Sequence, residues 1–289
     1  MASVLRVRAP ASTANMGPGF DCVGAALDFW NKLEISEGSG VSVTGEGANE
    51  ISADDRHLGI RAYATLAPVA GRHFAFHNRI PLERGLGSSA ATIALGLVAA
   101  AAVSGKSLSP DELLELALQF EDHPDNLAPA LLGGACVAWH GGGSCSARRI
   151  ADDLPLTPVV VIPSERASTV AARAALPEGL PFADAAHTVG RAAMLGAAIA
   201  HGDANLFARS LDDRLHEPYR AALSAPYRDL RHALPPGARG ATISGSGPTT
   251  IVWTDDARLD ECVSDLEARF GGAEVTAMSV SSTGAGVVA

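Results

Sequence analysis

The sequence predicts two mixed α+β domains with a cleft between them. Its 289 residues are too many for one small core and too few for three ordinary domains. Strand and helix patterns occur in both halves, and no internal repeat or low-complexity tail interrupts them. Residues 151–158, with two prolines and acidic residues, separate the halves. We therefore expect an N-terminal domain over residues 1–152 and a C-terminal domain over residues 153–289.

Alternating or β-branched residues predict the strands, and apolar stretches bounded by glycine or proline predict the helices. In the first half we expect strands at 3–9, 33–43, 73–80 and 135–140, and helices at 57–69 and 110–120. Within 84–105 we expect a glycine turn followed by an alanine-rich helix that ends at Gly105. Residues 11–31 and 141–149 are expected to be loops. In the second half we expect strands at 159–162, 240–244, 249–253 and 275–281, and helices at 168–175, 183–201, 205–213 and 259–270.

The composition excludes several classes of partner. Lysine and arginine number 22 against 32 acidic residues, which gives a formal net charge of −10. An acidic surface argues against nucleic acid or an anionic membrane as the main partner. The apolar run at 92–103 is too short to span a bilayer, and the N-terminus lacks a signal-peptide pattern. The four cysteines are scattered without a CxxC pair, so we expect reduced thiols and a cytoplasmic location.

The strongest local motif is the segment 84–91, Arg-Gly-Leu-Gly-Ser-Ser-Ala-Ala, at the start of an expected helix. Its glycines let the backbone curl, and its small residues let a ligand approach closely. The N–H groups and positive dipole end of the helix favour phosphate, and the two serines offer hydroxyls to a phosphate oxygen and to Mg²⁺. An ordinary strand-to-helix turn would use the same glycines, so the local pattern leaves both interpretations open.

Three other templates fit the sequence less well. Residues 85–90 match a loose dinucleotide fingerprint, but a charged stretch with a proline precedes them instead of a buried parallel strand. Residues 105–107, Gly-Lys-Ser, resemble the end of a Walker A loop, but Ala100 stands where that loop requires glycine. Neither Ser88 nor Ser246 lies in the Gly-x-Ser-x-Gly frame of a hydrolase nucleophile.

Two further polar segments are candidates for a site. Residues 121–126 read Glu-Asp-His-Pro-Asp-Asn, and a carboxylate there would suit Mg²⁺, which takes few protein oxygens. A solvated loop that caps the next helix is the alternative. Residues 244–248, Ser-Gly-Ser-Gly-Pro, form a turn between two expected strands, either for hairpin geometry or for close approach to a ligand.

Taken in order along the chain, three motifs resemble those of the GHMP kinases. They are ASTANMGPGFD near the N-terminus, PLERGLGSSAA in the middle and ISGSGPT near the C-terminus. The stretches PASTANMGPGFD and HPDNLAPALLGG resemble the homoserine kinase branch more than the sugar or isoprenoid branches. The resemblance implies a ribosomal-S5-domain-2-like N-terminal domain with a glycine-rich phosphate loop, packed on a ferredoxin-like C-terminal domain.

The resemblance implies an enzyme that uses ATP and Mg²⁺ to phosphorylate the hydroxyl of homoserine, a step of threonine biosynthesis. Its partners would be the two small-molecule substrates, with a homodimer as one option. Two other functions stay in view. One is a different GHMP kinase, of the mevalonate or shikimate type, and the other is a catalytically silent binding protein of the same fold.

The resemblance also assigns residues to the nucleotide and the metal. The nucleotide would contact the glycine loop and the C-terminal turn through Pro81, Arg84, Gly85, Leu86, Gly87, Ser88, Ser89, Ala90, Ala91, Gly245, Ser246 and Gly247. Ser89 and Glu121 would bind Mg²⁺, with Glu115 as the alternative carboxylate. Asp122 stands where the family has glycine, which adds a negative charge beside the expected metal site.

Homoserine carries an ammonium group, a carboxylate and one reactive hydroxyl, so a selective pocket needs an anion, a cation and a hydroxyl-positioning group. The resemblance supplies these substrate-binding residues: Asn15 and Asp21 at the amino end, His123 and Arg220 around the carboxylate, and Thr169 and Arg173 at further positions. Arg173 would also neutralise charge during phosphoryl transfer. For the hydroxyl, Asn126 would hold it in a reaction without a base, and Asp125 is the alternative as a base.

Overall fold

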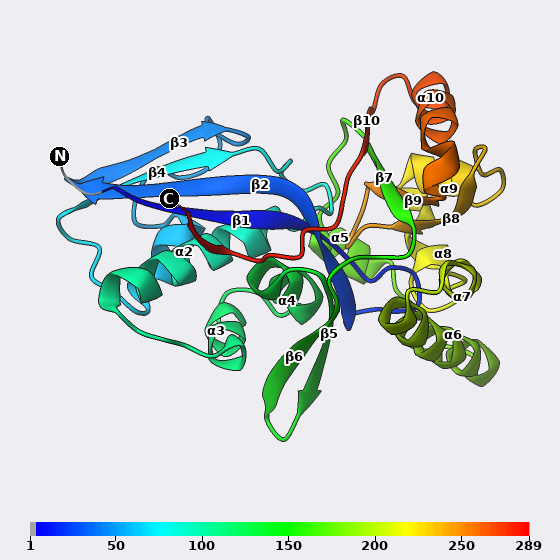
Figure 1. The fold of residues 1–289 in the computed structure, drawn as a ribbon, viewed down its shortest axis with the longest axis horizontal. Coiled ribbons are helices and arrows are strands. Elements are labelled where there is room, and N and C mark those ends of the chain that lie inside the picture. The colour runs from blue at the N-terminus through cyan, green and yellow to red at the C-terminus, as the bar shows by residue number, and fades with distance from the viewer. Residues whose placement is uncertain (1–3, 289) are drawn as a thin grey trace.

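The computed structural model describes residues 4–288 and arranges them around two β-sheets (Figure 1). Over these residues the first sheet has seven strands and the second has four. The chain passes from the first sheet to the second between residues 151 and 157, and it returns between residues 277 and 286. The last strand therefore belongs to the sheet in which the chain begins.

The first sheet is built around two long strands, β1 (Leu5–Ala14) and β2 (Val23–Glu37), which pair antiparallel. Its strand order is β11-β1-β2-β4-β3, and β5 pairs with the start of β2 and with β6. Only β3 and β4 run parallel; the other neighbours are antiparallel. The remaining strands are β3 (Gly40–Gly45), β4 (Arg72–Asn78), β5 (Ala135–Gly141), β6 (Ser144–Ala151) and β11 (Gly286–Val288).

Four helices belong to the first half: α1 (Leu58–Ala64), α2 (Ser88–Ser104), α3 (Pro110–Ala117) and α4 (Pro124–Leu132). The alanine-rich α2 has little amphipathic character, because it packs against α1, α3, α4 and β1. Small residues permit this close packing: a Cβ on Gly96 would lie 2.2 Å from the carbonyl oxygen of Gly59 in α1. The packing fixes the start of α2, which follows the glycine loop.

The second sheet has the order β10-β7-β9-β8, with every neighbour antiparallel. Its strands are β7 (Thr157–Ile162), β8 (Ala238–Ile243), β9 (Thr250–Thr254) and β10 (Glu274–Ala277). The helices of this half are α5 (Thr169–Ala174), α6 (Phe182–His201), α7 (Ala204–Ser210), α8 (Glu217–Arg220), α9 (Ala225–Leu230) and α10 (Leu259–Arg269). On one face Val159 and Val161 pack with α9 and α10. On the other face Val160 and Ile162 join the core of the first half.

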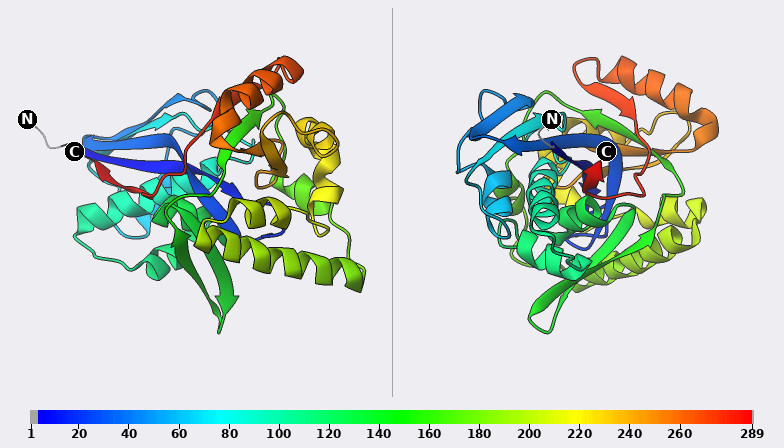
Figure 2. Two further views of the ribbon diagram at one scale, coloured as in Figure 1. Left: turned by 45° about the vertical axis from the view of Figure 1, so that its right-hand side comes forward. Right: turned by 60° about the vertical axis from the view of Figure 1, so that its left-hand side comes forward.

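The predicted α+β class with two sheet-and-helix units is confirmed (Figure 2). The proposed division after residue 152 stays a prediction, and β11, which comes after it in sequence, pairs with β1. No helix within 4–288 is long and apolar enough to cross a membrane.

Several predicted element boundaries are wrong. Most of the expected loop 11–31 is strand, because β1 continues to Ala14 and β2 begins at Val23. The strand residues in this range are mostly buried on both faces, so they lack the alternation that identifies a half-exposed strand. The expected strand 33–43 is interrupted at Gly38, where φ is 142°. The expected loop 141–149 is mainly strand β6, which forms a projecting hairpin with β5 (Figures 1 and 2).

The remaining differences are smaller. The expected strand 275–281 is limited to β10, and the short helices α4, α8 and α9 were not predicted as separate elements. The expected strand 3–9 begins with Ser3, which lies outside the described residues.

Candidate active site

A small polar cavity of about 50 Å³ lies where the two halves of the chain meet. The first half contributes the turn after β1, the polar residues before α4 and the first turn of that helix. The second half contributes α5, α8 and the turn after β8. The lining residues are Asn15, Asp21, Glu121, His123, Asp125, Asn126, Thr169, Arg173, Arg220, Gly245 and Ser246.

The turn between β1 and β2 is held in shape by the Asn15 side chain. Asn15 and Asp21 have φ values of 71° and 56°, a left-handed conformation that non-glycine residues rarely adopt. Asn15 Oδ1 accepts the backbone N–H of Asp21 at 3.0 Å, and Asn15 Nδ2 donates to the carbonyl oxygen of Gly245 at 2.8 Å. One amide thus fixes the position of Asp21 and ties this turn to the one after β8.

The glycine loop packs directly against the turn after β8. Ser244 Oγ donates to the carbonyl oxygen of Gly85 at 2.6 Å, and a Cβ on Gly85 would lie 2.1 Å from the Ser244 carbonyl oxygen. Gly87, with φ of 67°, precedes α2 and leaves no room for a side chain, because its Cβ would lie 2.1 Å from Ser12 Oγ. In the part of the chain that the structure describes, the N-cap residue of α2, Gly87, makes no side-chain capping hydrogen bond. The first N–H groups of α2 are therefore available to an anion.

Two carboxyl groups lie in the cavity without enough partners. Asp125 is 2% exposed, and its Oδ1 has no hydrogen-bond partner among residues 4–288. Burial, assisted by the charges of Asp21 and Glu121, raises the Asp125 pKa to about 7. Burial also raises the pKa of Glu121, although Ser89 hydrogen-bonds to this carboxyl group. Glu121 Oε2 likewise lacks a partner among the described residues.

Two arginines form the cationic wall. Arg173 donates from Nη2 to Asp21 Oδ1 at 2.5 Å and from Nε to His123 Nε2 at 3.2 Å. Arg220 is 2% exposed and donates to the carbonyl oxygens of Ala172 and Gly245, both at 3.2 Å. Both guanidinium groups lie over one aromatic ring, that of Phe20, at 4.9 and 5.1 Å from its centroid. Burial and then the neighbouring Arg173 charge lower the pKa of Arg220.

Comparison with known proteins identifies the family. Residues 56–134 match the model of the GHMP kinases N terminal domain, and residues 195–272 match that of the GHMP kinases C terminal domain. The homoserine kinase of Moorella thermoacetica is 40% identical over 255 residues, which cover 86% of each chain. The chain belongs to the GHMP kinase family. The predicted family resemblance is thereby confirmed.

Two further relatives cover nearly the whole GHMP kinase chain. The homoserine kinase of Thermosynechococcus vestitus is 39% identical and covers 94% of this chain, with 93% of its own length matched. The crystal structure of homoserine kinase from Cytophaga hutchinsonii superposes with a TM-score of 0.87 at 26% identity, covering 99% of this chain and 97% of that one. The predicted two-domain GHMP kinase fold is therefore confirmed as well.

Every substrate-pocket residue expected from the sequence lies in the one cavity of this GHMP kinase, together with Asp125, Asn126 and Glu121. Asn126 Oδ1 accepts the Ser12 hydroxyl at 2.9 Å, which leaves its amide N–H groups available. Glu115 is exposed on α3 and Asp122 is exposed beside the cavity, and neither lines it. Arg84 also lies outside the lining, since its guanidinium donates to backbone carbonyls of the second half.

The sequence did not indicate the buried residues that fix α8, the helix that carries Arg220. Glu217 starts α8; its Oε1 accepts the N–H of Ile243 at 2.7 Å and its Oε2 accepts the Tyr227 hydroxyl at 2.8 Å. Asp213 caps the same helix, and His216 Nε2 lies 2.8 Å from the Gly17 carbonyl oxygen. The sequence signal available for Glu217 was its position three residues before Arg220, which places both on the same face of a helix.

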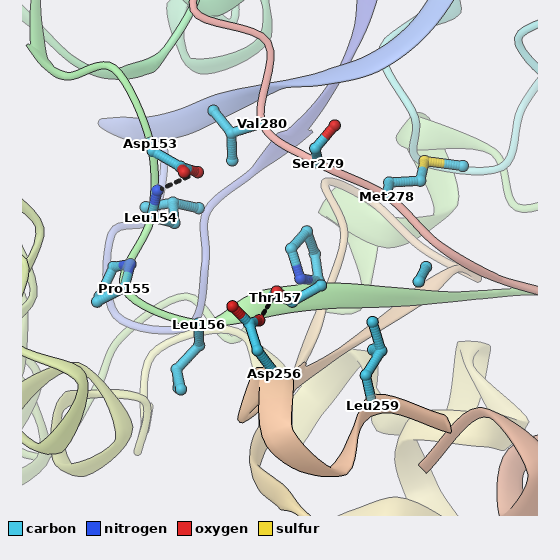
Figure 3. Close-up of a pocket in the computed structure, with 12 residues that line it drawn as sticks. Asp153, Leu154, Pro155, Leu156, Thr157, Asp256, Leu259, Met278, Ser279 and Val280 are labelled. Carbon is cyan, nitrogen blue, oxygen red and sulfur yellow. Dashed lines mark hydrogen bonds between the residues drawn. The ribbon is translucent and has the colours of Figure 1, made fainter. Parts of the chain in front are cut away.

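A larger cavity of about 320 Å³ lies elsewhere, between the two segments that connect the sheets (Figure 3). Residues 153–158 form one wall and residues 277–280 another, with Asp256 and Leu259 completing it. It contains none of the motif residues, so chemistry rather than size selects the smaller cavity as the active site.

Proposed function

We propose that this GHMP kinase transfers the γ-phosphoryl group of ATP to the hydroxyl of homoserine. The observation that carries the proposal is one cavity with an acid, Asp21, and two arginines, beside a glycine loop at an uncapped helix. Relatives that are 35–40% identical over most of the chain are homoserine kinases. A zwitterionic alcohol matches this charge distribution better than mevalonate or a sugar, neither of which has an ammonium group.

The two ends of homoserine are assigned to oppositely charged groups of this cavity. Asp21 would take the ammonium group, and Arg173 and Arg220 the carboxylate, with His123 and Thr169 beside them. Without substrate, Asp21 and Arg173 pair with each other at 2.5 Å. Substrate binding would exchange this pair for two charge-assisted contacts, so neither charge loses a partner.

Mg²⁺ belongs to the proposal on the chemistry of the donor groups. The described residues hold no cluster of three or more His, Cys, Asp or Glu side chains suited to a metal ion. A phosphate-bound Mg²⁺ needs fewer protein ligands, and the unpartnered Glu121 Oε2 and the adjacent Ser89 hydroxyl fit that need. Mg²⁺ held by Ser89 and Glu121 would neutralise negative charge on the phosphates.

The reaction requires little covalent chemistry from the protein. The N–H groups at the start of α2 would hold the phosphates, and the Asn126 amide would orient the homoserine hydroxyl. We assign the proton acceptor to Asp125, because its Oδ1 is buried in the same cavity and has no partner within residues 4–288. The homoserine oxygen bonds to the γ-phosphorus, the β–γ bridging P–O bond breaks, and the hydroxyl proton moves to the carboxylate.

A cytoplasmic location and a homodimer complete the proposal. All four cysteines are free thiols, which suits a reducing compartment. Gel filtration with light scattering would test the homodimer.

The deciding experiment is a coupled ADP-release assay with MgATP over a panel of acceptors. We expect homoserine to be turned over in preference to serine, threonine, mevalonate, shikimate and galactose, with background ADP release when no acceptor is present. Turnover of mevalonate, shikimate or a sugar without turnover of homoserine would overturn the substrate assignment and leave the family intact.

A further inference from the structure

Arg84 joins the phosphate loop to the segment that leads into α5. It directly precedes Gly85, but its side chain turns toward the second half of the chain. Arg84 Nε donates to the carbonyl oxygen of Pro163 at 2.9 Å, and Nη2 donates to that of Ser164 at 2.8 Å. These carbonyls follow the last residue of β7, so one guanidinium bridges the glycine loop and the second sheet.

A backbone hydrogen bond strengthens the same connection. Glu83 has φ of 54°, a conformation that costs energy for a non-glycine residue and that persists only where surrounding contacts hold it. Its carbonyl oxygen accepts the N–H of Ala167 at 2.9 Å. The residues just before the glycine loop are thus attached at two points to residues 163–167, which we call the clasp segment.

Only Ser168, the N-cap residue, separates the clasp segment from α5, which carries the pocket residues Thr169 and Arg173. This helix has six residues, and only Ala172 is buried, so its own packing anchors it weakly. Its position depends on its attachments. The clasp segment leads into one end, and near the other end Arg220 Nε binds the Ala172 carbonyl oxygen at 3.2 Å.

We propose that Arg84 is a positioning residue that couples nucleotide binding at the glycine loop to homoserine binding at α5. The inference rests on the proposed function. When nucleotide phosphates order the glycine loop, the Arg84 contacts fix the clasp segment and with it Arg173. The conformational entropy lost in ordering Arg173 is then lost on nucleotide binding, so homoserine binding no longer carries that cost. By linkage, homoserine must tighten nucleotide binding by the same factor.

The competing role for Arg84 is direct binding of ATP phosphates. For that role Nε and Nη2 would have to leave the Pro163 and Ser164 carbonyls, to which they donate at 2.9 and 2.8 Å. The two roles predict different measurements. A phosphate ligand changes nucleotide affinity in the absence of homoserine, whereas a coupling residue changes the effect of one ligand on the other.

A second contact offers a graded comparison. Arg166 of the clasp segment binds both carboxylate oxygens of Glu50, with N–O distances of 2.5 and 2.8 Å. The two side chains are 37% and 53% exposed, so water and salt screen this pair. Arg166→Met should reduce coupling less than Arg84→Met does. Arg56, which pairs with Asp54 on the surface, provides a charge-matched control through Arg56→Met.

The experiment is calorimetric titration of homoserine with and without Mg²⁺ and a non-hydrolysable ATP analogue. In the wild type we expect the analogue to tighten homoserine binding roughly 5- to 150-fold, the usual range for coupled sites. Arg84→Met should bring this factor close to one. Its affinity for the analogue in the absence of homoserine should stay within about threefold of the wild-type value. Arg84→Lys should recover part of the coupling, because lysine keeps the charge and loses the two-pronged contact. Arg56→Met should match the wild type.

The outcomes separate the inference from the proposed function. If the wild type does not bind homoserine at all, the proposed function fails. If homoserine binds equally with and without the analogue, or if Arg84→Met retains the full factor, the coupling role is wrong and the kinase assignment stands. A tenfold or greater loss of analogue affinity without homoserine would make Arg84 a phosphate ligand. Circular dichroism checks the fold of each variant, and Arg84→Lys answers the question if Arg84→Met does not fold.

Discussion

At the scale of single residues, the active site contains an acid whose burial opposes its ionisation. Asp125 follows Pro124 at the start of α4, where its side chain is buried and one oxygen has no hydrogen-bond partner among the described residues. Its pKa is raised from 3.8 to about 7, mainly by burial. A carboxyl group poised near neutral pH suits proton transfer, and it costs stability once it ionises.

Asp125→Asn tests both consequences. The neutral folded form of Asp125 stabilises the wild type fully below pH about 4, and this stability is lost as pH rises to about 7. We therefore expect the variant to have a higher urea midpoint than the wild type at pH 8, with the difference shrinking toward pH 4. Its turnover should fall by about 10²- to 10⁴-fold, and the rise of kcat/KM with pH through about 7 should disappear.

The exposed neighbour provides the control for this experiment. Asp122→Asn removes one carboxylate from the same segment and should change neither the pH profile nor the urea midpoint strongly. Near wild-type turnover in Asp125→Asn would mean that the reaction proceeds without a base, with Asn126 positioning the hydroxyl.

The metal ligands give a second prediction at this scale. Ser89→Ala and Glu121→Gln should each lower kcat at least about tenfold and raise the Mg²⁺ concentration needed for half-maximal rate, because each removes an oxygen ligand. Glu115→Gln should behave as the wild type, since Glu115 is exposed and outside the cavity. Collapse of activity in Glu115→Gln alone would transfer the role to that residue. Full activity in Ser89→Ala and in both glutamate variants would end the metal–carboxylate idea.

Residue types and spacing alone could not predict which residues meet in this site. Asn15, His123 and Arg220 are separated by about a hundred residues each, and only the ordered motifs of the family connect them. The structure brings them to one cavity, which the sequence reading predicted through resemblance. Glu217 was missed because its importance depends on tertiary contacts with Ile243 and Tyr227 that no local pattern encodes.

At the scale of elements, the short helix α8 fixes the position of β8 and of the turn after it, which lines the pocket. Glu217 holds the end of β8, and Arg220 holds the turn after it through Gly245. Helices of four residues do not persist on their own, so buried side chains define this one.

The β5–β6 hairpin was not predicted, for a different reason. Its glycine-rich tip suggested a loop, although Cys145 and Ala147 alternate with polar residues as expected for a strand.

Arg220→Ala should raise KM for homoserine by roughly 30- to 1000-fold, from about 2–4 kcal/mol for a desolvated charge-assisted contact. KM for ATP should change little. The structure adds a stability cost of about 1–3 kcal/mol, because the Ala172 and Gly245 carbonyls lose a buried donor. Steady-state kinetics and urea unfolding measure the two effects. Arg228→Ala, which removes an exposed arginine from α9, is the matched control.

A substrate analogue distinguishes the substrate-binding role of Arg220 from its structural role in holding the turn after β8. The compound 3-amino-1-propanol lacks the carboxylate of homoserine, so the wild type should discriminate strongly against it. The Arg220→Ala variant should discriminate much less between homoserine and this analogue. Undiminished discrimination would mean that Arg220 supports the turn after β8 without contacting substrate.

At the scale of the whole molecule, the two halves share one hydrophobic core. The main buried cluster contains Val7 and Leu27 of the first sheet together with Val160, Phe207 and Trp253 of the second half. The return of the chain to β11 adds a second covalent connection between the sheets. The active site lies at this junction, so its geometry depends on both halves being folded.

The shared core predicts that the halves unfold together. Trp30 lies in the first sheet at 9% exposure and Trp253 lies buried in the second, so each reports on one half. Variants Trp139→Phe/Trp253→Phe and Trp30→Phe/Trp139→Phe leave one reporter each. Because the substitutions themselves change stability, fluorescence must be compared with far-ultraviolet circular dichroism within each variant. We expect the two urea midpoints to coincide in both variants, as a single cooperative transition requires. Independent domains would instead give a biphasic circular dichroism curve, in which Trp30 and Trp253 each follow a different phase.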